Sequence, residues 1–148
     1  MKKRFTLTLM SLMLFMYACT YSGVYINRDN DDAEGRSVVR RFYADVAQKN
    51  YRGIDSLVSD SLKQLAGADG VNKIVKFINN KVGNYKSYEI VDRYIRRVTG
   101  SNNETSYNYK LKVTYDKGVI DEILGFRKQN GPEIKMNSYH ANSDLLMK

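Results

Sequence analysis

Histidine and cysteine, which most often bind zinc or act as bases and nucleophiles near neutral pH, are rare in this 148-residue chain. The chain has one histidine, His140, and one cysteine, Cys19. This excludes zinc sites that need two imidazoles or several thiolates. His140 lies beside Tyr139 near the C-terminus, and a lone histidine there is more typical of a surface position than of an oriented general base. We therefore predict no metal site and no catalytic residue.

Three acidic residues within the predicted strands raise a second question of chemistry. Asp121 and Glu122 are adjacent, so their side chains point to opposite faces of a strand and cannot act as a paired acid and base. Glu122 is in register with the apolar Ile120 and Leu124, and an inward position would raise its pKa by desolvation. We prefer an exposed position beside a turn for Glu122 and a β-bulge at Asp92.

Tyrosines recur on one face of a predicted strand and could line a ligand cavity. They are Tyr107, Tyr109 and Tyr115. A tyrosine combines a flat apolar ring with a polar tip, which suits an amphiphile or a sugar. Ordinary packing of helices on the sheet is the alternative and carries more weight. Neither interpretation requires a cofactor.

The N-terminus has the pattern of an export signal. Lys2, Lys3 and Arg4 precede 14 uncharged residues, 5–18. This run is shorter than the roughly 20 residues of a membrane-spanning helix and fits the apolar part of a signal peptide. A buried core helix is the alternative, but a basic triplet directly before it is more typical of a signal. We predict a signal peptide over residues 1–18.

The end of the run, Met16-Tyr17-Ala18-Cys19, resembles the lipobox of bacterial lipoprotein signal peptides. In that family the chain is cut before the cysteine, and the thiol and the new amine are acylated. The resemblance implies that Cys19 carries palmitate or a similar chain, and that residues 19–148 keep a net charge of +5 instead of +8. It implies a lipid anchor at the cell envelope. Because Thr20, and not Asp, follows Cys19, the outer membrane is favoured over the inner one.

Residues 19–32 are predicted to be an acylated cysteine followed by a flexible tether. The stretch shows no helical period and ends in Asn and Asp residues. Residues 29–31 resemble the start of a calcium loop, but Ala33 and Glu34 then stand where an oxygen ligand and the turn glycine are required. We predict instead a helix N-cap at Asp31 or Asp32.

Helical periodicity begins at Ala33, and after Gly83 the period changes from 3.6 to 2. The first part predicts one long helix, two short helices and a helix over residues 71–82. The second part predicts a meander of four strands, and Asn130-Gly131 indicates a hairpin with positive φ at Gly131. Helices before strands predict an α+β domain over residues 33–142, with the helices packed on a four-stranded antiparallel sheet. The predicted strands span 85–98, 105–115, 119–128 and 134–140, and a tail follows over 143–148.

This order of elements, the Phe42-Tyr43 pair and the terminal hairpin 125–131 resemble the nuclear transport factor 2-like superfamily, which has a cystatin-like cone. The chain is more similar to small, export-targeted members of that superfamily, of unknown function, on bacterial envelopes. The resemblance implies a domain that binds a small amphiphilic ligand or an envelope protein. A small enzyme of the ketosteroid-isomerase or polyketide-cyclase kind is the alternative, and an assembly component that docks through its sheet is a third.

Without a convincing acid–base pair, we expect a binding domain that is not an enzyme. Arg93, Arg96 and Arg97 form a basic cluster. Charges that protect a solvated sheet edge are the default interpretation, and anionic lipid is the alternative. Nucleic acid is not expected as the partner of an exported protein.

Overall fold

The computed structural model describes residues 22–147, so Cys19 and the predicted signal peptide lie outside the described residues. Within this part of the chain, no helix is both long and apolar enough to cross a membrane. The elements, in chain order, are β1 (Gly23–Ile26), α2 (Asp29–Ala47), α3 (Tyr51–Leu57), α4 (Asp60–Ala66), α5 (Gly70–Val82), β2 (Tyr85–Thr99), β3 (Glu104–Tyr115), β4 (Gly118–Gln129), β5 (Ile134–Asn142) and the 3₁₀ helix η2 (Asp144–Leu146).

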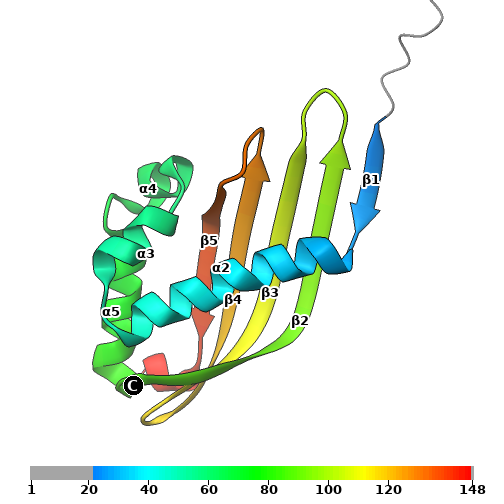
Figure 1. Cartoon of the computed structure of the whole chain (residues 1–148). Coiled ribbons are helices and arrows are strands. Elements are labelled where there is room, and N and C mark those ends of the chain that lie inside the picture. Colours follow the sequence, from blue (N-terminus) through cyan, green and yellow to red (C-terminus); the bar gives the residue numbers. More distant parts are fainter. Residues whose placement is uncertain (1–21, 148) are drawn as a thin grey trace, which may run out of the picture.

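The strands form one antiparallel sheet in the order β1-β2-β3-β4-β5, and α2 runs across one face of it (Figure 1). The predicted α+β class is confirmed, but the sheet has five strands and not four. The fifth strand is β1, in which Gly23 lies opposite Thr99 and Ile26 opposite Arg96. It occupies part of the segment predicted as a tether. Four residues are too few to show alternation, and their partner strand lies about 70 residues further along the chain.

Asn27 fastens β1 to the sheet. Its backbone N–H donates to the carbonyl oxygen of Ile95 at 2.9 Å, and its side-chain Oδ1 accepts from the Ile95 N–H at 2.8 Å. Asn27 has φ of 50°, a left-handed conformation that asparagine tolerates. It therefore turns the chain from β1 into α2 without loss of hydrogen bonds to β2.

The first helix begins at Asp29 and not at Ala33, so the predicted N-cap is wrong. Arg28 occupies the cap position, and its side chain makes no capping hydrogen bond. Asp31 and Asp32 lie instead in the first helical turn, where a negative charge interacts favourably with the helix dipole. Both are buried and form ion pairs with arginines, Asp31 with Arg28 and Asp32 with Arg36. A capping pattern in the sequence does not indicate such pairs.

The remaining elements follow the predicted periodicity closely. Ser59 caps α4, because its hydroxyl accepts the Leu62 N–H at 3.2 Å. The register of β2 against β3 shifts between Ile90 and Asp92, which confirms the β-bulge expected there. Leu145 and Leu146 of η2 pack against the core, so the tail is docked. The fully buried large side chains include Phe42, Tyr43, Ile54, Ile78, Ile95, Leu111, Ile120, Leu124, Phe126 and Met136.

The hairpin between β4 and β5 is confirmed, but its left-handed residue is Asn130, with φ of 50°, and not Gly131. The loop has four residues instead of two, so the type I′ geometry that needs a left-handed glycine is not used. A Cβ at Gly131 would have only one near neighbour, the Gln129 carbonyl oxygen at 3.8 Å.

We predict that Asn130→Val lowers the free energy of unfolding by about 1–2 kcal/mol, because a β-branched residue is strained in the left-handed region. Asn130→Gly should be nearly neutral, and Gly131→Val should cost less than Asn130→Val. Urea denaturation followed by tyrosine fluorescence measures all three. A larger loss in Gly131→Val than in Asn130→Val would contradict this account of the turn.

Candidate functional site

The three tyrosines predicted to line a cavity all point into the core, and each hydroxyl meets a carboxylate of the same chain. Tyr107 Oη donates to Glu34 Oε2 at 2.9 Å, and Tyr109 Oη donates to Asp32 Oδ1 at 3.2 Å. Tyr115 Oη donates to Glu122 Oε1 at 2.7 Å. Tyr107 and Tyr109 therefore connect β3 to α2, whereas Tyr115 connects β3 to β4. Binding of a ligand by these tyrosines stays a prediction.

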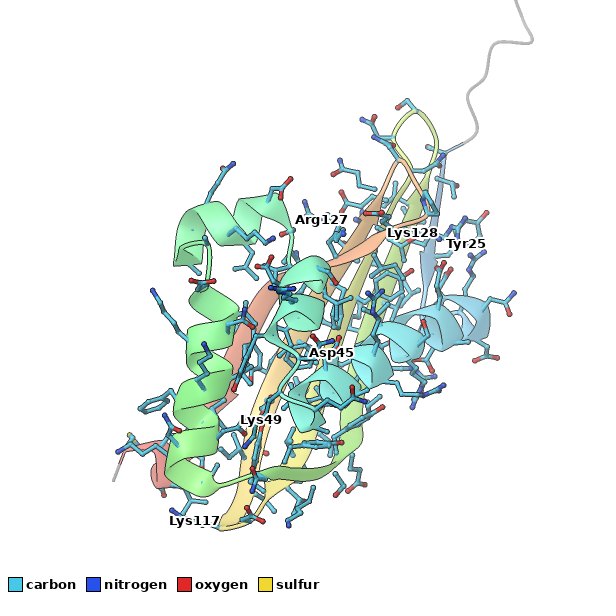
Figure 2. All side chains as sticks on the ribbon, turned by 60° about the vertical axis from the view of Figure 1, so that its left-hand side comes forward. Tyr25, Asp45, Lys49, Lys117, Arg127 and Lys128 are labelled. Atoms are coloured by element: carbon cyan, nitrogen blue, oxygen red, sulfur yellow. The ribbon has the colours of Figure 1, made fainter. Side chains whose placement is uncertain are left out.

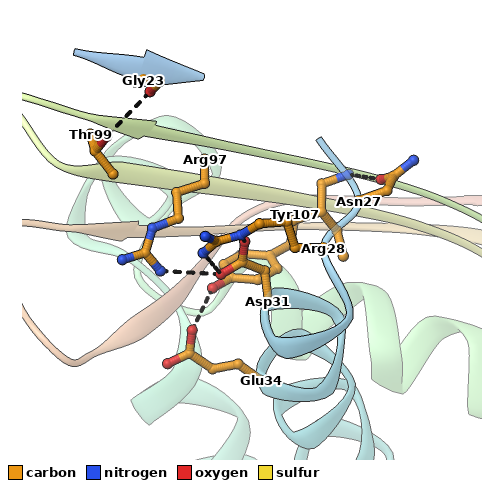
Figure 3. A network of polar contacts seen from close by, with 9 residues as sticks. Gly23, Asn27, Arg28, Asp31, Glu34, Arg97, Thr99 and Tyr107 are labelled. Carbon is orange, nitrogen blue, oxygen red and sulfur yellow. Dashed lines mark hydrogen bonds and ion pairs between the residues drawn. The ribbon is translucent and has the colours of Figure 1, made fainter. Parts of the chain in front are cut away.

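The acidic first turns of α2 form an ionic cluster with β2 (Figure 3). Asp31 accepts from Arg28 Nε at 2.8 Å and from Arg97 Nη1 at 3.1 Å. Asp32 lies 2.8 Å from Arg36 Nε and 3.3 Å from Arg93 Nε. Hydrogen bonds from Arg28, with a smaller contribution from Arg97, outweigh burial and hold the pKa of Asp31 below its ordinary value.

The interpretation of the arginine cluster as edge protection is therefore wrong for two of its three members. Arg93 and Arg97 point towards α2 and pair with its carboxylates. Arg96 is exposed on the opposite face. The residues around Arg97 are also not at an edge, since β1 covers that part of β2. The sequence could not show this, because the covering strand was not predicted.

Glu122 is the principal buried titratable group, with 1% of its surface exposed. Its carboxylate accepts hydrogen bonds from Tyr115 Oη at 2.7 Å, Tyr139 Oη at 2.9 Å and Tyr43 Oη at 3.0 Å. These hydroxyls come from β3, β5 and α2, so one carboxylate joins three elements to β4. The exposed position preferred for Glu122 is wrong, whereas its register with Ile120 and Leu124 was the correct signal.

Burial raises the pKa of Glu122, and the three tyrosine hydrogen bonds offset only part of that rise. Burial, followed by the nearby Glu122 charge, raises the pKa of Tyr115 and Tyr139 above the ordinary tyrosine value. The Tyr43 ring also stacks on Tyr88, with ring centroids 4.7 Å apart. The arrangement, called here the Glu122 cluster (Tyr43, Tyr115, Glu122, Tyr139), is a carboxyl held among weakly acidic hydroxyls and shielded from water.

His140 lies on the other face of the sheet. It is exposed on β5 opposite Ile123, whereas Glu122 points into the core. The two side chains therefore cannot form an acid–base pair. Asp92 is also exposed, and a hydrogen bond from Lys110 at 3.0 Å lowers its pKa. Among residues 22–147, no group of three or more His, Cys, Asp and Glu side chains is arranged to hold a metal ion.

Two neighbouring clefts lie between the helices and the β4–β5 hairpin, with volumes of about 570 and 650 Å³. They share Ser56, Glu133 and Lys135, so we treat them together as the hairpin groove. Lys135 Nζ donates to the Ser56 carbonyl oxygen at 3.0 Å and ties the two walls together. The other lining residues are Glu34, Ser37, Val38, Arg41, Leu57, Val58, Ser59, Asp60, Ser61, Lys63, Arg127, Gln129, Pro132, Ile134 and Asn137.

Several solved structures are similar in fold to this chain. No protein-family model and no curated protein matches the chain. A solved structure from Streptomyces avermitilis, described as a candidate dehydratase of the NTF2-like (nuclear transport factor 2-like) family, is 14% identical with a TM-score of 0.49. The match covers 77% of this chain and 97% of that one. No activity is carried over from that protein.

Because of the Glu122 cluster, we predict an unusual dependence of the free energy of unfolding on pH. Because the folded-state pKa of Glu122 lies above the ordinary value of 4.5, its contribution is fully present below that pH and is lost as pH rises through the folded-state pKa. Asp31 has the opposite sign, since its lowered pKa gives stability that is lost in acid. The free energy of unfolding of Glu122→Gln, relative to that of the original chain, should therefore rise from pH 4.5 to 8. Urea titrations across this range measure it, and parallel curves would contradict the raised pKa.

At Gly35, α2 lies close to two side chains of β3. A Cβ at this position would lie 2.2 Å from Tyr109 Oη and 2.6 Å from Tyr107 Cδ1. Both rings are buried and hydrogen-bonded, so neither can move freely. We predict that Gly35→Ala lowers the free energy of unfolding by about 1–2 kcal/mol, because overpacking outweighs the better helix propensity of alanine. Gly131→Ala is the control and should change the urea midpoint little. Equal midpoints for both variants would contradict the close packing.

Proposed function

We propose that this chain is a lipid-anchored protein of the bacterial cell envelope, on the outer membrane, whose domain binds a small amphiphilic ligand or a protein partner without catalysis. The observation that carries the binding part is the location of the polar groups. Inside the domain, tyrosine hydroxyls and carboxylates hydrogen-bond one another. The hairpin groove, in contrast, is open to solvent and lined by polar side chains.

The composition of the hairpin groove supports an amphiphile as ligand. One end carries Val38, Leu57 and Ile134, which offer apolar contact. The other end carries serine hydroxyls together with Lys63, which pairs with Asp55 at 2.9 Å, and Arg127, whose Nε lies 3.7 Å from Glu104. Asn137 Oδ1 is buried in that wall without a hydrogen-bond partner. A molecule with a short apolar part and a hydroxylated or anionic head would complement both ends.

Mass spectrometry of the full chain, purified from membranes in mild detergent, tests the binding site. The non-denatured protein should carry a bound small molecule that is lost after denaturation. Ser56→Trp places a large ring where the two clefts meet and should remove that molecule, while Ile123→Trp on the opposite face of the sheet should retain it. Retention of the molecule in Ser56→Trp would place the binding site elsewhere.

The lipid anchor is tested on the same material. The sequence Met16-Tyr17-Ala18-Cys19 supports removal of residues 1–18 and acylation of Cys19. The N-terminal peptide should then begin at Cys19 and carry two or more acyl chains. A peptide that begins elsewhere, or an unmodified Cys19, would overturn the anchor.

A second candidate function, a small isomerase or cyclase-like enzyme, is favoured by the Glu122 cluster. A carboxyl with a raised pKa beside tyrosine hydroxyls could remove a proton next to a carbonyl while a hydroxyl stabilises the oxyanion. The closed packing around Glu122 opposes it, because a substrate would have to displace core side chains. Conversion of a β,γ-unsaturated ketone to its conjugated isomer is followed by ultraviolet absorbance. Activity lost in a folded Glu122→Gln variant would support the enzyme.

A further inference from the structure

We infer that one end of the sheet lies directly against the bilayer. This end, called the proximal end, consists of Gly23, the turn Gly100–Asn103 and the hairpin loop Asn130–Glu133, at the top of Figure 1. The inference rests on the proposed acylation of Cys19 and adds to it the orientation of the domain and the surface that meets lipid.

The distance argument starts from the length of chain between the lipid and the sheet. Only Thr20, Tyr21 and Ser22 separate Cys19 from Gly23, the first residue of β1. Four fully extended steps span at most about 14 Å. Gly23 therefore lies within about 14 Å of the acylated cysteine. The part of the domain nearest to Gly23 must lie beside the lipid headgroups.

The first strand is held firmly enough to transmit this constraint. Its four residues pair with β2, and Asn27 makes two further hydrogen bonds to Ile95. The Arg28 guanidinium lies 4.7 Å from the centroid of the Tyr25 ring. The same arginine binds Asp31, so β1, the connection and α2 form one network (Figure 3).

The proximal end is a single surface and not three separate tips. Gly23 lies opposite Thr99, which leads into the turn Gly100–Asn103. The Asn130 N–H donates to the Asn103 carbonyl oxygen at 3.1 Å, which joins the two turns. The opposite end of the sheet is marked by Lys117, whereas Arg127 and Lys128 lie towards the proximal end (Figure 2). The 12 residues of β3 separate the two ends, a length of about 40 Å.

The chemistry of the proximal end fits contact with lipid headgroups of any charge. The two turns present Ser101, Asn102 and Asn130, which can hydrogen-bond to phosphate or glycerol oxygens, and Glu133 is the only charged residue in them. Of the cations behind them, Arg97 pairs with Asp31, Lys128 with Glu34 and Arg127 with Glu104. Arg96 is exposed on the other face of β2. On β1, Val24 follows Gly23 directly and is 57% exposed, which supplies apolar contact at the same corner.

Energy transfer to a labelled lipid tests the orientation. Acylation occupies Cys19, so an added cysteine is the free thiol to label with a fluorescent donor. We use acylated Asn102→Cys and Lys117→Cys, in vesicles of phosphatidylcholine containing acceptor-labelled phosphatidylethanolamine. Both positions are exposed, and unchanged melting temperatures verify the fold. Transfer from position 102 should exceed transfer from position 117 several-fold.

Other results of this experiment would overturn either the orientation or the anchor. Equal transfer from two vesicle-bound variants would overturn the orientation and leave the anchor intact. Protein that stays in solution and takes up label at Cys19 would overturn the anchor itself. A second set of vesicles contains phosphatidylglycerol. If the several-fold difference appears only there, attraction to anionic lipid orients the domain, and the inferred contact through uncharged groups is wrong.

Discussion

Glu122→Leu should lower the free energy of unfolding by about 3–5 kcal/mol, more than any other single core substitution we propose. Leucine fits the apolar surroundings of Ile120 and Leu124, but it accepts no hydrogen bond. The hydroxyls of Tyr43, Tyr115 and Tyr139 would all lose their acceptor. A buried donor left without a partner costs about 1–3 kcal/mol, and removal of the buried carboxyl returns part of the total. Urea denaturation at pH 7, followed by tyrosine fluorescence, measures the loss.

Matched variants separate hydrogen bonding from packing in the Glu122 cluster. Glu122→Gln keeps the side-chain shape and one acceptor oxygen, so its loss should be smaller than that of Glu122→Leu. Tyr115→Phe should be destabilising in the original chain but much less so in Glu122→Leu, because the phenylalanine leaves one unpaired hydroxyl fewer. Additive losses in the double variant would show that the hydroxyl and the carboxylate act independently, contrary to the structure.

The Glu122 cluster shows what alternation can and cannot predict. The strict period of two in β3 places Tyr107, Tyr109 and Tyr115 on the inner face, and the structure confirms that face. The same rule places Glu122 inside. The competing expectation is an exposed position beside the turn. Burial depends on hydrogen-bond partners, and these lie 79, 7 and 17 residues away in sequence. No local pattern identifies partners at such separations.

The helix N-terminus and the edge of the sheet were missed for a related reason. Asp31 and Asp32 have the composition of a helix cap, yet the helix begins earlier, at Asp29. Their carboxylates pair with arginines instead, Asp31 with Arg28 and Asp32 with Arg36. The four-residue β1 exists because β2 continues to Thr99 and offers a partner. A strand this short can be predicted only when the position of β2 in the sheet is already known. The intrinsic strand preference of four residues is a weak signal.

In chains from which the signal has been removed, Cys19→Ser should release the domain from membranes almost completely. Two or more acyl chains bind a bilayer durably, because each buried methylene contributes about 0.8 kcal/mol, whereas one chain gives only marginal binding. Serine cannot form the thioether that would carry the proposed lipid. Residues 20–32 have no apolar run long enough to replace it. Cell fractionation with detection of the full chain should find the original protein in the membrane pellet and the variant in the soluble fraction.

The comparison must be restricted to chains from which the signal has been removed, because an uncut apolar run at residues 5–18 could itself hold the variant at a membrane. Intact mass identifies the chains that lack residues 1–18. Thr20→Ser is the matched control, since it changes a neighbouring side chain and leaves the thiol in place, and it should remain in the pellet. If the signal-free Cys19→Ser chain also sediments with membranes, a protein or lipid contact of the folded domain holds it there. The position of β1 near the membrane would then result from that contact and not from an acylated cysteine.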